Sequence, residues 1–133
     1  MKITAELVRS WSPCSAYREP GVLESLSGGR AMSVCDVLRL PIPGADRLWV
    51  VLREGLLPNG IYREFAAMCA DIALTNERDA GREPDKRSWA AVDVALRHAA
   101  GEATDAELAA AWDAASDQWC ELLLALCVER GIA

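Results

Sequence analysis

The sequence predicts an all-α protein, and three observations support this fold class. Apolar residues recur at spacings of three and four along most of the chain, the period of an amphipathic helix. Capping residues and glycines stand where these segments begin and end. The one strand-like run, residues 48–52, has no second run to pair with, so a helix is favoured there too.

The first 44 residues predict two or three short helices. Thr4 is suited to cap the first helix, and Pro20 is suited to the first turn of the second. Ser33 and Asp36 have the spacing of a capping box, which predicts a third short helix that ends before Pro41.

Four longer helices are predicted after residue 44, over about 45–54, 60–75, 86–100 and 105–130. An amphipathic helix buries one apolar face, so the spacing also predicts which side chains point inward. These are Leu48, Trp49 and Leu52 in the first helix, Ile61, Phe65, Met68, Cys69 and Ile72 in the second, Trp89, Val92 and Leu96 in the third, and Leu108, Trp112, Ala115, Trp119, Leu122 and Leu126 in the long C-terminal helix.

The ends of the later helices are marked by local signals. The polar stretch 76–85 predicts a loop, after which Asp85 or Ser88 can cap the third long helix. Gly101 closes that helix, and Thr104 with Glu107 forms a capping box that opens the last one. The last helix is expected to end before Gly131.

One compact helical bundle is the expected organisation. A chain of 133 residues is typical of one domain, here 1–133, and buries enough surface to fold without a metal or disulfide. Residues 1–44 form the region of short helices in this prediction, and residues 45–133 form the bundle core.

Composition favours a cytoplasmic protein. No apolar run approaches the roughly 20 residues of a membrane span, and the charged N-terminal stretch predicts no secretion signal. The five cysteines (Cys14, Cys35, Cys69, Cys120 and Cys127) are odd in number and contain no CxxC pair, so reduced thiols are expected.

The net charge of −6 is unevenly distributed. Residues 1–70 carry eight basic and seven acidic side chains, whereas residues 71–121 carry five basic and twelve acidic ones. Acidic surfaces repel phosphates, so direct binding of nucleic acid is not expected. A protein partner with a basic surface fits better, whereas a membrane partner is not expected, and the oligomeric state is left open.

No catalytic constellation is visible in the sequence. His98 is the one histidine and lies near a predicted helix C-terminus, where its partial positive charge is favourable. It has no second histidine or cysteine pair at metal-ligand spacing, so neither a metal nor a cofactor is predicted. The protein is therefore expected not to be an enzyme. The alternative is a nucleophile at Cys69, Cys120 or Cys127 that meets its base in space.

Acidic side chains near the last helix are the candidate partner-binding residues. Asp113, Asp117 and Glu121 are spaced by four, on the side opposite the predicted tryptophan stripe. Such a row of acids is typical of a solvated face, a partner-binding face or a cation site. Glu102 and Asp105 extend the partner-binding face toward the preceding turn.

Residues 61–115 resemble a loose group of Ala-rich helical proteins from phages, prophages and other mobile regions, some described as immunity proteins. The similar segments are 67–74 (AMCADIAL), 88–92 (SWAAV) and 99–111 (AAGEATDAELAAA). This resemblance implies a context of mobile elements and host defence, and it implies no catalytic residues.

The leading hypothesis is a non-enzymatic, protein-binding inhibitor from a phage or mobile element, such as an anti-CRISPR or other anti-defence protein. Its acidic face would bind a basic surface that otherwise holds nucleic acid. The alternatives are an immunity protein that neutralises a toxin, a structural or assembly component of a phage, and the cysteine-dependent enzyme.

Overall fold

The structure is a computed structural model that describes residues 2–129, except for the side chains of residues 118, 119, 122, 123 and 126–129. The described chain is helical and contains no strand, which confirms the predicted fold class. It divides into two compact units, an N-terminal unit (Met1–Pro58) and a C-terminal unit (Asn59–Ala133). None of the described helices is both long and apolar enough to cross a membrane.

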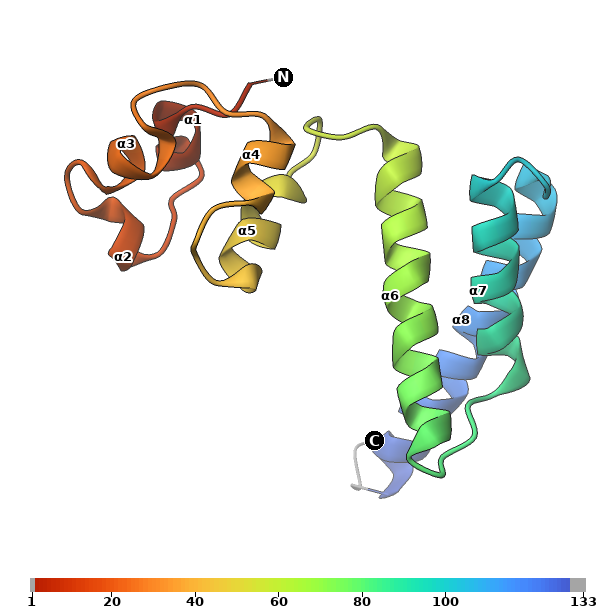
Figure 1. Ribbon diagram of the computed structural model, residues 1–133. Helices are drawn as coiled ribbons and strands as arrows, with labels where there is room; N and C mark the ends of the chain where they lie inside the picture. Colours follow the sequence, from red (N-terminus) through yellow and green to blue (C-terminus); the bar gives the residue numbers. More distant parts are fainter. Residues whose placement is uncertain (1, 130–133) are drawn as a thin grey trace. The chain divides into compact units, whose positions relative to one another are not determined.

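Five short helices make up the N-terminal unit (Figure 1). They are α1 (Ala5–Ser10), α2 (Ser15–Arg18), α3 (Val22–Ser27), α4 (Val34–Leu38) and α5 (Gly44–Val51). Thr4 caps α1 as predicted, because its hydroxyl accepts a hydrogen bond from the Leu7 backbone. Ser33 and Asp36 form the predicted capping box of α4, and the hydrogen bonds from Ser33 hold the pKa of Asp36 below its usual range.

Two features of this unit differ from the prediction. The sequence did not indicate α2, a single turn without a side-chain cap. The fifth helix, α5, was expected in the bundle core with the longer helices, but it packs against α4 and belongs to the N-terminal unit. The division between the two units follows Pro58, not residue 44.

The core of the N-terminal unit is small and built around Ile3, which is fully buried. The backbones of Ile3 and Met32 exchange two hydrogen bonds of 2.8 Å, which tie the chain's first residues to the segment before α4. The other buried apolar residues in this core are Val8, Leu23, Val37, Val50, Val51 and Leu56.

The apolar face predicted for α5 is wrong. Leu48, Trp49 and Leu52 are 38%, 38% and 44% exposed, and α5 instead buries Val50 and Val51. Both sides of this helix are apolar, so helical period alone does not select the buried one. The exposed Trp49 still has partners: its ring meets that of Trp11 edge-on at 6.3 Å, and the Arg53 guanidinium lies 4.1 Å from its centre.

A partly buried polar contact joins α2 to α5. The Tyr17 hydroxyl donates a hydrogen bond of 2.7 Å to Asp46 Oδ2. Together with burial, this bond to a carboxylate favours the neutral phenol and raises the pKa of Tyr17 from 10.0 to about 12.

The raised pKa of Tyr17 predicts a loss of stability at alkaline pH. The stabilisation is fully present below the unfolded pKa of 10.0, and it is lost as the pH rises toward the folded value of about 12. We expect the free energy of unfolding of the N-terminal unit to fall over this window, with a smaller fall in Tyr17→Phe. Urea titrations at pH 8 to 12 measure both, and identical pH profiles for the two proteins would contradict the prediction.

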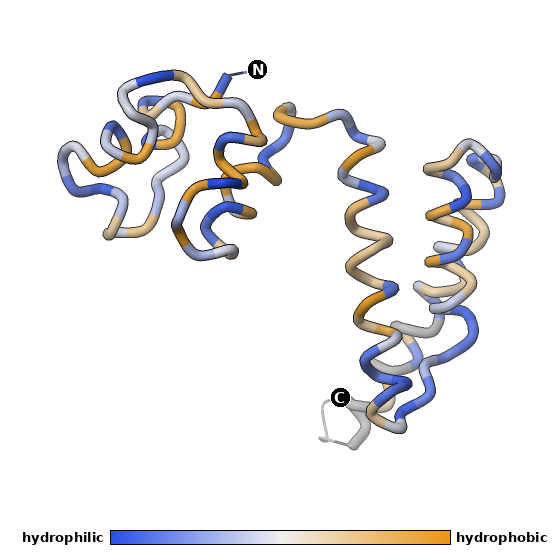
Figure 2. The backbone as a smooth tube through the Cα atoms, viewed as in Figure 1, coloured by the Kyte–Doolittle hydropathy of each residue, from blue (hydrophilic) through white to orange (hydrophobic). Residues whose placement is uncertain are grey.

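The C-terminal unit consists of three helices, α6 (Asn59–Asp79), α7 (Lys86–Ala99) and α8 (Asp105–Glu129). A hydrophilic loop joins α6 to α7, shown in blue at the foot of the two helices in Figure 2. It is shorter than the predicted loop 76–85, since α6 continues to Asp79. Glycines at positive φ, Gly81 (82°) and Gly101 (78°), end the first two helices, a conformation that costs glycine little.

Caps at the starts of α7 and α8 are those predicted. Asp85 accepts a hydrogen bond from the Arg87 backbone at the head of α7. At the head of α8 the Thr104 backbone N–H donates to the Glu107 carboxylate at 2.7 Å, and the Glu107 backbone N–H donates to the Thr104 hydroxyl at 3.1 Å. The predicted stop at Gly131 lies outside the described residues.

The apolar face predicted for α6 is also wrong. Ile61, Phe65, Met68 and Ile72 are 37–59% exposed, and Cys69 is exposed too, whereas the buried residue of this helix is Ala67. The alanines of α6 lie on the side opposite these large residues, and among them Ala67 is buried, Ala70 is partly buried, and Ala66 and Ala73 are exposed. On α7 the predicted face is correct, with Val92 buried and Trp89 and Leu96 partly buried.

Candidate protein-binding groove

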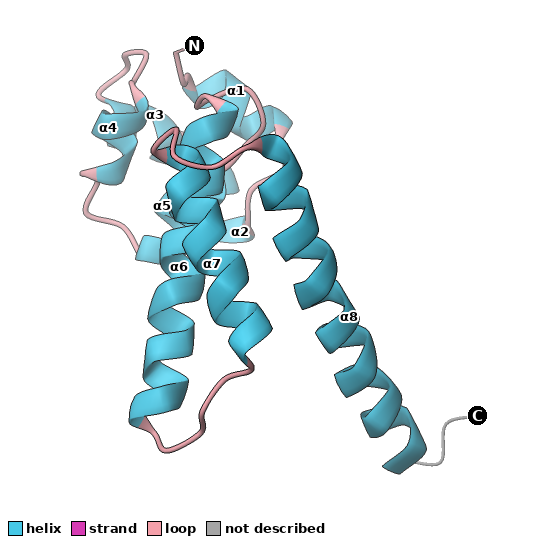
Figure 3. Ribbon diagram, turned by 90° about the vertical axis from the view of Figure 1, so that its right-hand side faces the viewer, coloured by secondary structure: helices cyan, strands magenta, loops and turns pink. Residues whose placement is uncertain are grey.

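The three helices of the C-terminal unit form an open layer. Helix α7 packs against both α6 and α8, while α6 and α8 have few close contacts among the described residues. Figure 3 shows α8 diverging from the α6–α7 pair along its length. A groove of about 870 Å³ results, with residues of all three helices in its lining.

The groove is open because alanines line it. They are Ala66, Ala67, Ala70 and Ala73 of α6, Ala91 and Ala95 of α7, and Ala109 and Ala115 of α8. A methyl group does not reach across the gap between neighbouring helices, so the space stays unfilled. Among the described residues, Ala67, Val92 and Ala115 are the buried apolar residues of this unit, which is a very small core.

Trp112 was expected in the core of the bundle, and this prediction is wrong. Its side chain is 58% exposed and lines the groove, next to the partly buried Leu108. Ala115 of the same predicted stripe is buried, as expected. Trp119, Leu122 and Leu126 of this stripe lie outside the described side chains.

The predicted acidic residues have three different environments. Glu102 lies exposed in the turn before α8, and Asp105 opens α8 and pairs with His98 at 2.6 Å. Asp113 and Asp117 are exposed. Asp113 lines the groove beside Trp112, so it does not lie opposite the tryptophan as predicted.

Glu121 is held by Arg87 of α7. The guanidinium donates to both carboxylate oxygens, at 2.8 and 3.1 Å, and to Asp85 at 3.0 Å. These bonds hold the pKa of Glu121 and of Asp85 below their usual range. Glu121 therefore serves to join α8 to the start of α7, a contact that sequence spacing does not reveal.

His98 lies at one end of the groove. It is in the last turn of α7, and its partner Asp105 is in the first turn of α8. An acidic side chain in the first turn of a helix, such as Asp105, interacts favourably with the helix dipole. Cys14, Cys35, Cys69 and Cys120 carry free thiols, and no described cysteine lines the groove. The described residues contain no cluster of three metal-ligating side chains.

No protein-family model, curated protein or solved structure matches this chain. The resemblance of residues 61–115 to phage-associated helical proteins therefore stays a hypothesis. What the groove can do follows from its own geometry and chemistry. It has apolar walls and an exposed tryptophan, and its charged lining residues are Asp113 of α8, Arg63 of α6, and Asp105 paired with His98. An apolar ligand whose positive charge lies on the α8 side, beside Asp113, suits this combination.

Proposed function

We propose that the C-terminal unit binds a basic amphipathic helix of another protein in the groove between α6, α7 and α8. The observation that carries this proposal is the alanine-lined groove with Trp112 and Asp113 side by side on its rim. A bundle of four helices is a common way to bury apolar helix faces, and three helices in an open layer leave room for a fourth.

Each part of the groove has a role in this proposal. The alanines receive the apolar side chains of the incoming helix, and Trp112 packs against them, as exposed tryptophans at interfaces often do. Asp113 and the neighbouring Asp117 meet its basic residues. Glu121 contributes less, because both of its carboxylate oxygens already accept hydrogen bonds from Arg87.

The same chemistry supports the inhibitor hypothesis. A helix that carries many basic residues is typical of surfaces that bind nucleic acid, and an acidic protein that covers it competes with the phosphates. On this proposal the protein acts by binding and performs no catalysis. An anti-defence protein of a phage and an immunity protein are both inhibitors of this kind.

Designed peptides test the binding mode with the full chain. The first is an amphipathic Leu/Lys helix of about 18 residues, five turns, and the second is its Leu/Glu counterpart. We expect the Leu/Lys peptide to bind and to perturb the NMR signals of α6, α7 and α8, with weaker binding at high salt. The Leu/Glu peptide should not bind.

Two variants of α8 and one control locate the contact. Trp112→Ala should weaken binding of the Leu/Lys peptide about 30-fold, which corresponds to a loss of about 2 kcal/mol. Asp113→Lys should also weaken binding of the Leu/Lys peptide, and the loss of affinity should be larger at low salt than at high salt. The control is Glu64→Lys, the same charge reversal at an exposed α6 position outside the groove lining. Equal weakening by Glu64→Lys, or no binding of the peptide, would reject the proposal.

A further inference from the structure

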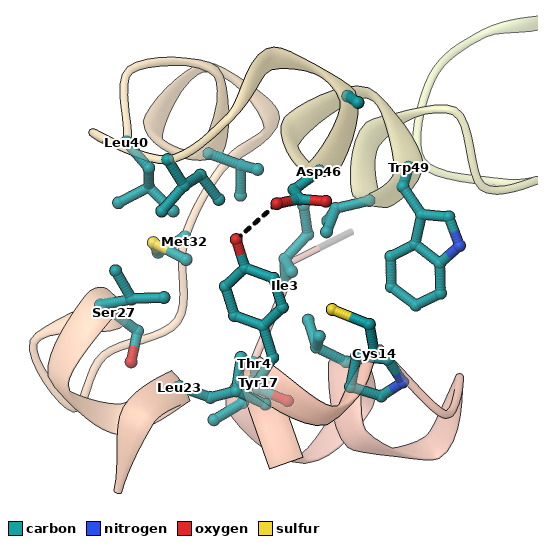
Figure 4. A pocket seen from close by; sticks show the side chains of 18 residues that line it. Ile3, Thr4, Cys14, Tyr17, Leu23, Ser27, Met32, Leu40, Asp46 and Trp49 are labelled. Carbon is teal, nitrogen blue, oxygen red and sulfur yellow. Dashed lines mark hydrogen bonds between the residues drawn. The ribbon is translucent and has the colours of Figure 1, made fainter. Parts of the chain in front are cut away.

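The N-terminal unit contains a separate cavity of about 260 Å³ (Figure 4). Residues from the chain's start, from α3, from the segment before α4 and from α5 line it, among them Ile3, Leu23, Met32 and Val50. All of its lining residues belong to this one unit. A cavity of about 150 Å³ is already large enough for benzene, so this one has room for a ring with a short chain.

The lining is mostly apolar. Most of its few polar side chains have a hydrogen-bond partner within the described part of the unit, but one carboxylate oxygen does not. The Thr4 hydroxyl accepts from the Leu7 backbone, and the Ser27 hydroxyl donates to the Glu24 carbonyl. Tyr17 donates to Asp46 Oδ2. The second carboxylate oxygen, Asp46 Oδ1, has no hydrogen-bond donor among the described residues.

Figure 4 shows the Asp46 carboxylate in the cavity wall between Tyr17 and Trp49. None of the lining residues is basic, so the carboxylate is the one charged group of the lining. A carboxylate accepts several hydrogen bonds and attracts a positive charge, and the Asp46 side chain is partly buried beside the apolar lining. The Asp46 carboxylate would repel an anionic ligand, and no basic residue of the lining would offset this repulsion.

We propose that this cavity binds a small organic amine, with its apolar body among the core side chains and its ammonium group on Asp46. Charge complementarity decides between an amine and a neutral molecule of the same shape. The Tyr17 hydroxyl holds the carboxylate toward the cavity through its bond to Oδ2, and Oδ1 is left for the ligand.

Three probes of similar size and different charge test this site on the full chain: 2-phenylethylammonium, 2-phenylethanol and 3-phenylpropionate. Binding is followed by NMR shifts of residues 3–50 at neutral pH. We expect the ammonium to bind at least about tenfold more tightly than the alcohol, since a hydrogen bond to a charged group is worth about 1.5 kcal/mol or more. The propionate should not bind.

Variants separate the charge from the cavity. Asp46→Asn should remove the tenfold preference and leave the alcohol's affinity within about twofold, whereas Glu54→Gln, an exposed carboxylate of the same unit, should change neither. Ala5→Leu adds volume at a partly buried position of the lining, keeps Asp46 and should abolish binding of both probes. The proposal is overturned if the ammonium binds no more tightly than the alcohol, or if Ala5→Leu binds both probes as the unmodified protein does.

Discussion

Replacing Ile3 by alanine should lower the free energy of unfolding of the N-terminal unit by about 3 kcal/mol. Ile3 is 0% exposed and lies at the centre of a core of eight buried residues. Removing three carbons from such a site costs about 3 kcal/mol, through lost burial and the cavity left behind. A unit of this length has a total stability of roughly 3–9 kcal/mol, so the change removes a third of it or more.

The substitution isolates side-chain packing from backbone bonding. The two hydrogen bonds between Ile3 and Met32 involve main-chain atoms only, so alanine can make them equally well. Native-state hydrogen exchange of the amides in α4 and α5 gives the free energy of opening in each protein. We expect it to fall by about 3 kcal/mol in Ile3→Ala.

Ile61→Ala is the matched control for this experiment. It is the same change at a site that is 46% exposed on α6, and surface substitutions usually alter stability by no more than about 0.5 kcal/mol. A loss below about 1 kcal/mol in Ile3→Ala would mean that Ile3 is not the centre of the core.

Filling the groove of the C-terminal unit should stabilise that unit and abolish binding of the basic peptide. Ala70 and Ala95 both line the groove and are only partly buried, so leucine at both positions occupies space that is now empty. Filling a cavity commonly adds about 0.5–2 kcal/mol of stability. The same side chains occupy the space that the incoming helix requires, so we expect affinity to fall at least about tenfold.

A gain in stability together with a loss of peptide affinity distinguishes a functional groove from loose packing. Thermal unfolding and peptide titration are measured on Ala70→Leu with Ala95→Leu, and on the control Ala90→Leu. Ala90 is exposed on α7 outside the groove lining, so its substitution should leave peptide binding unchanged. Unchanged affinity in the double variant would show that the peptide binds elsewhere.

Helix ends could be predicted from the sequence because capping is local. The hydroxyl of Thr4, the Ser33–Asp36 box and the Thr104–Glu107 box each act within four residues of chain. Helix α2 was missed because it is a single turn of four residues without a side-chain cap, too short to show a helical period.

The candidate site was only partly predictable. Sequence spacing identified Asp113 and Asp117 as exposed acids, and this is correct. The ion pair of Glu121 with Arg87 joins residues 34 positions apart, and no spacing rule connects them. The position of Trp112 beside Asp113 on the groove rim depends on how far α8 diverges from α6.

The sequence by itself determined that the chain is helical and where most of its helices begin and end. Only the tertiary structure decided which faces of α5 and α6 are buried. On α6 both sides are apolar, with large residues such as Phe65 on one and alanines such as Ala67 on the other. Helical period locates a buried face only when the opposite face is polar, and close helix packing here buried the small residues. The groove exists for the same reason, since alanines bring helices together without filling the space between them.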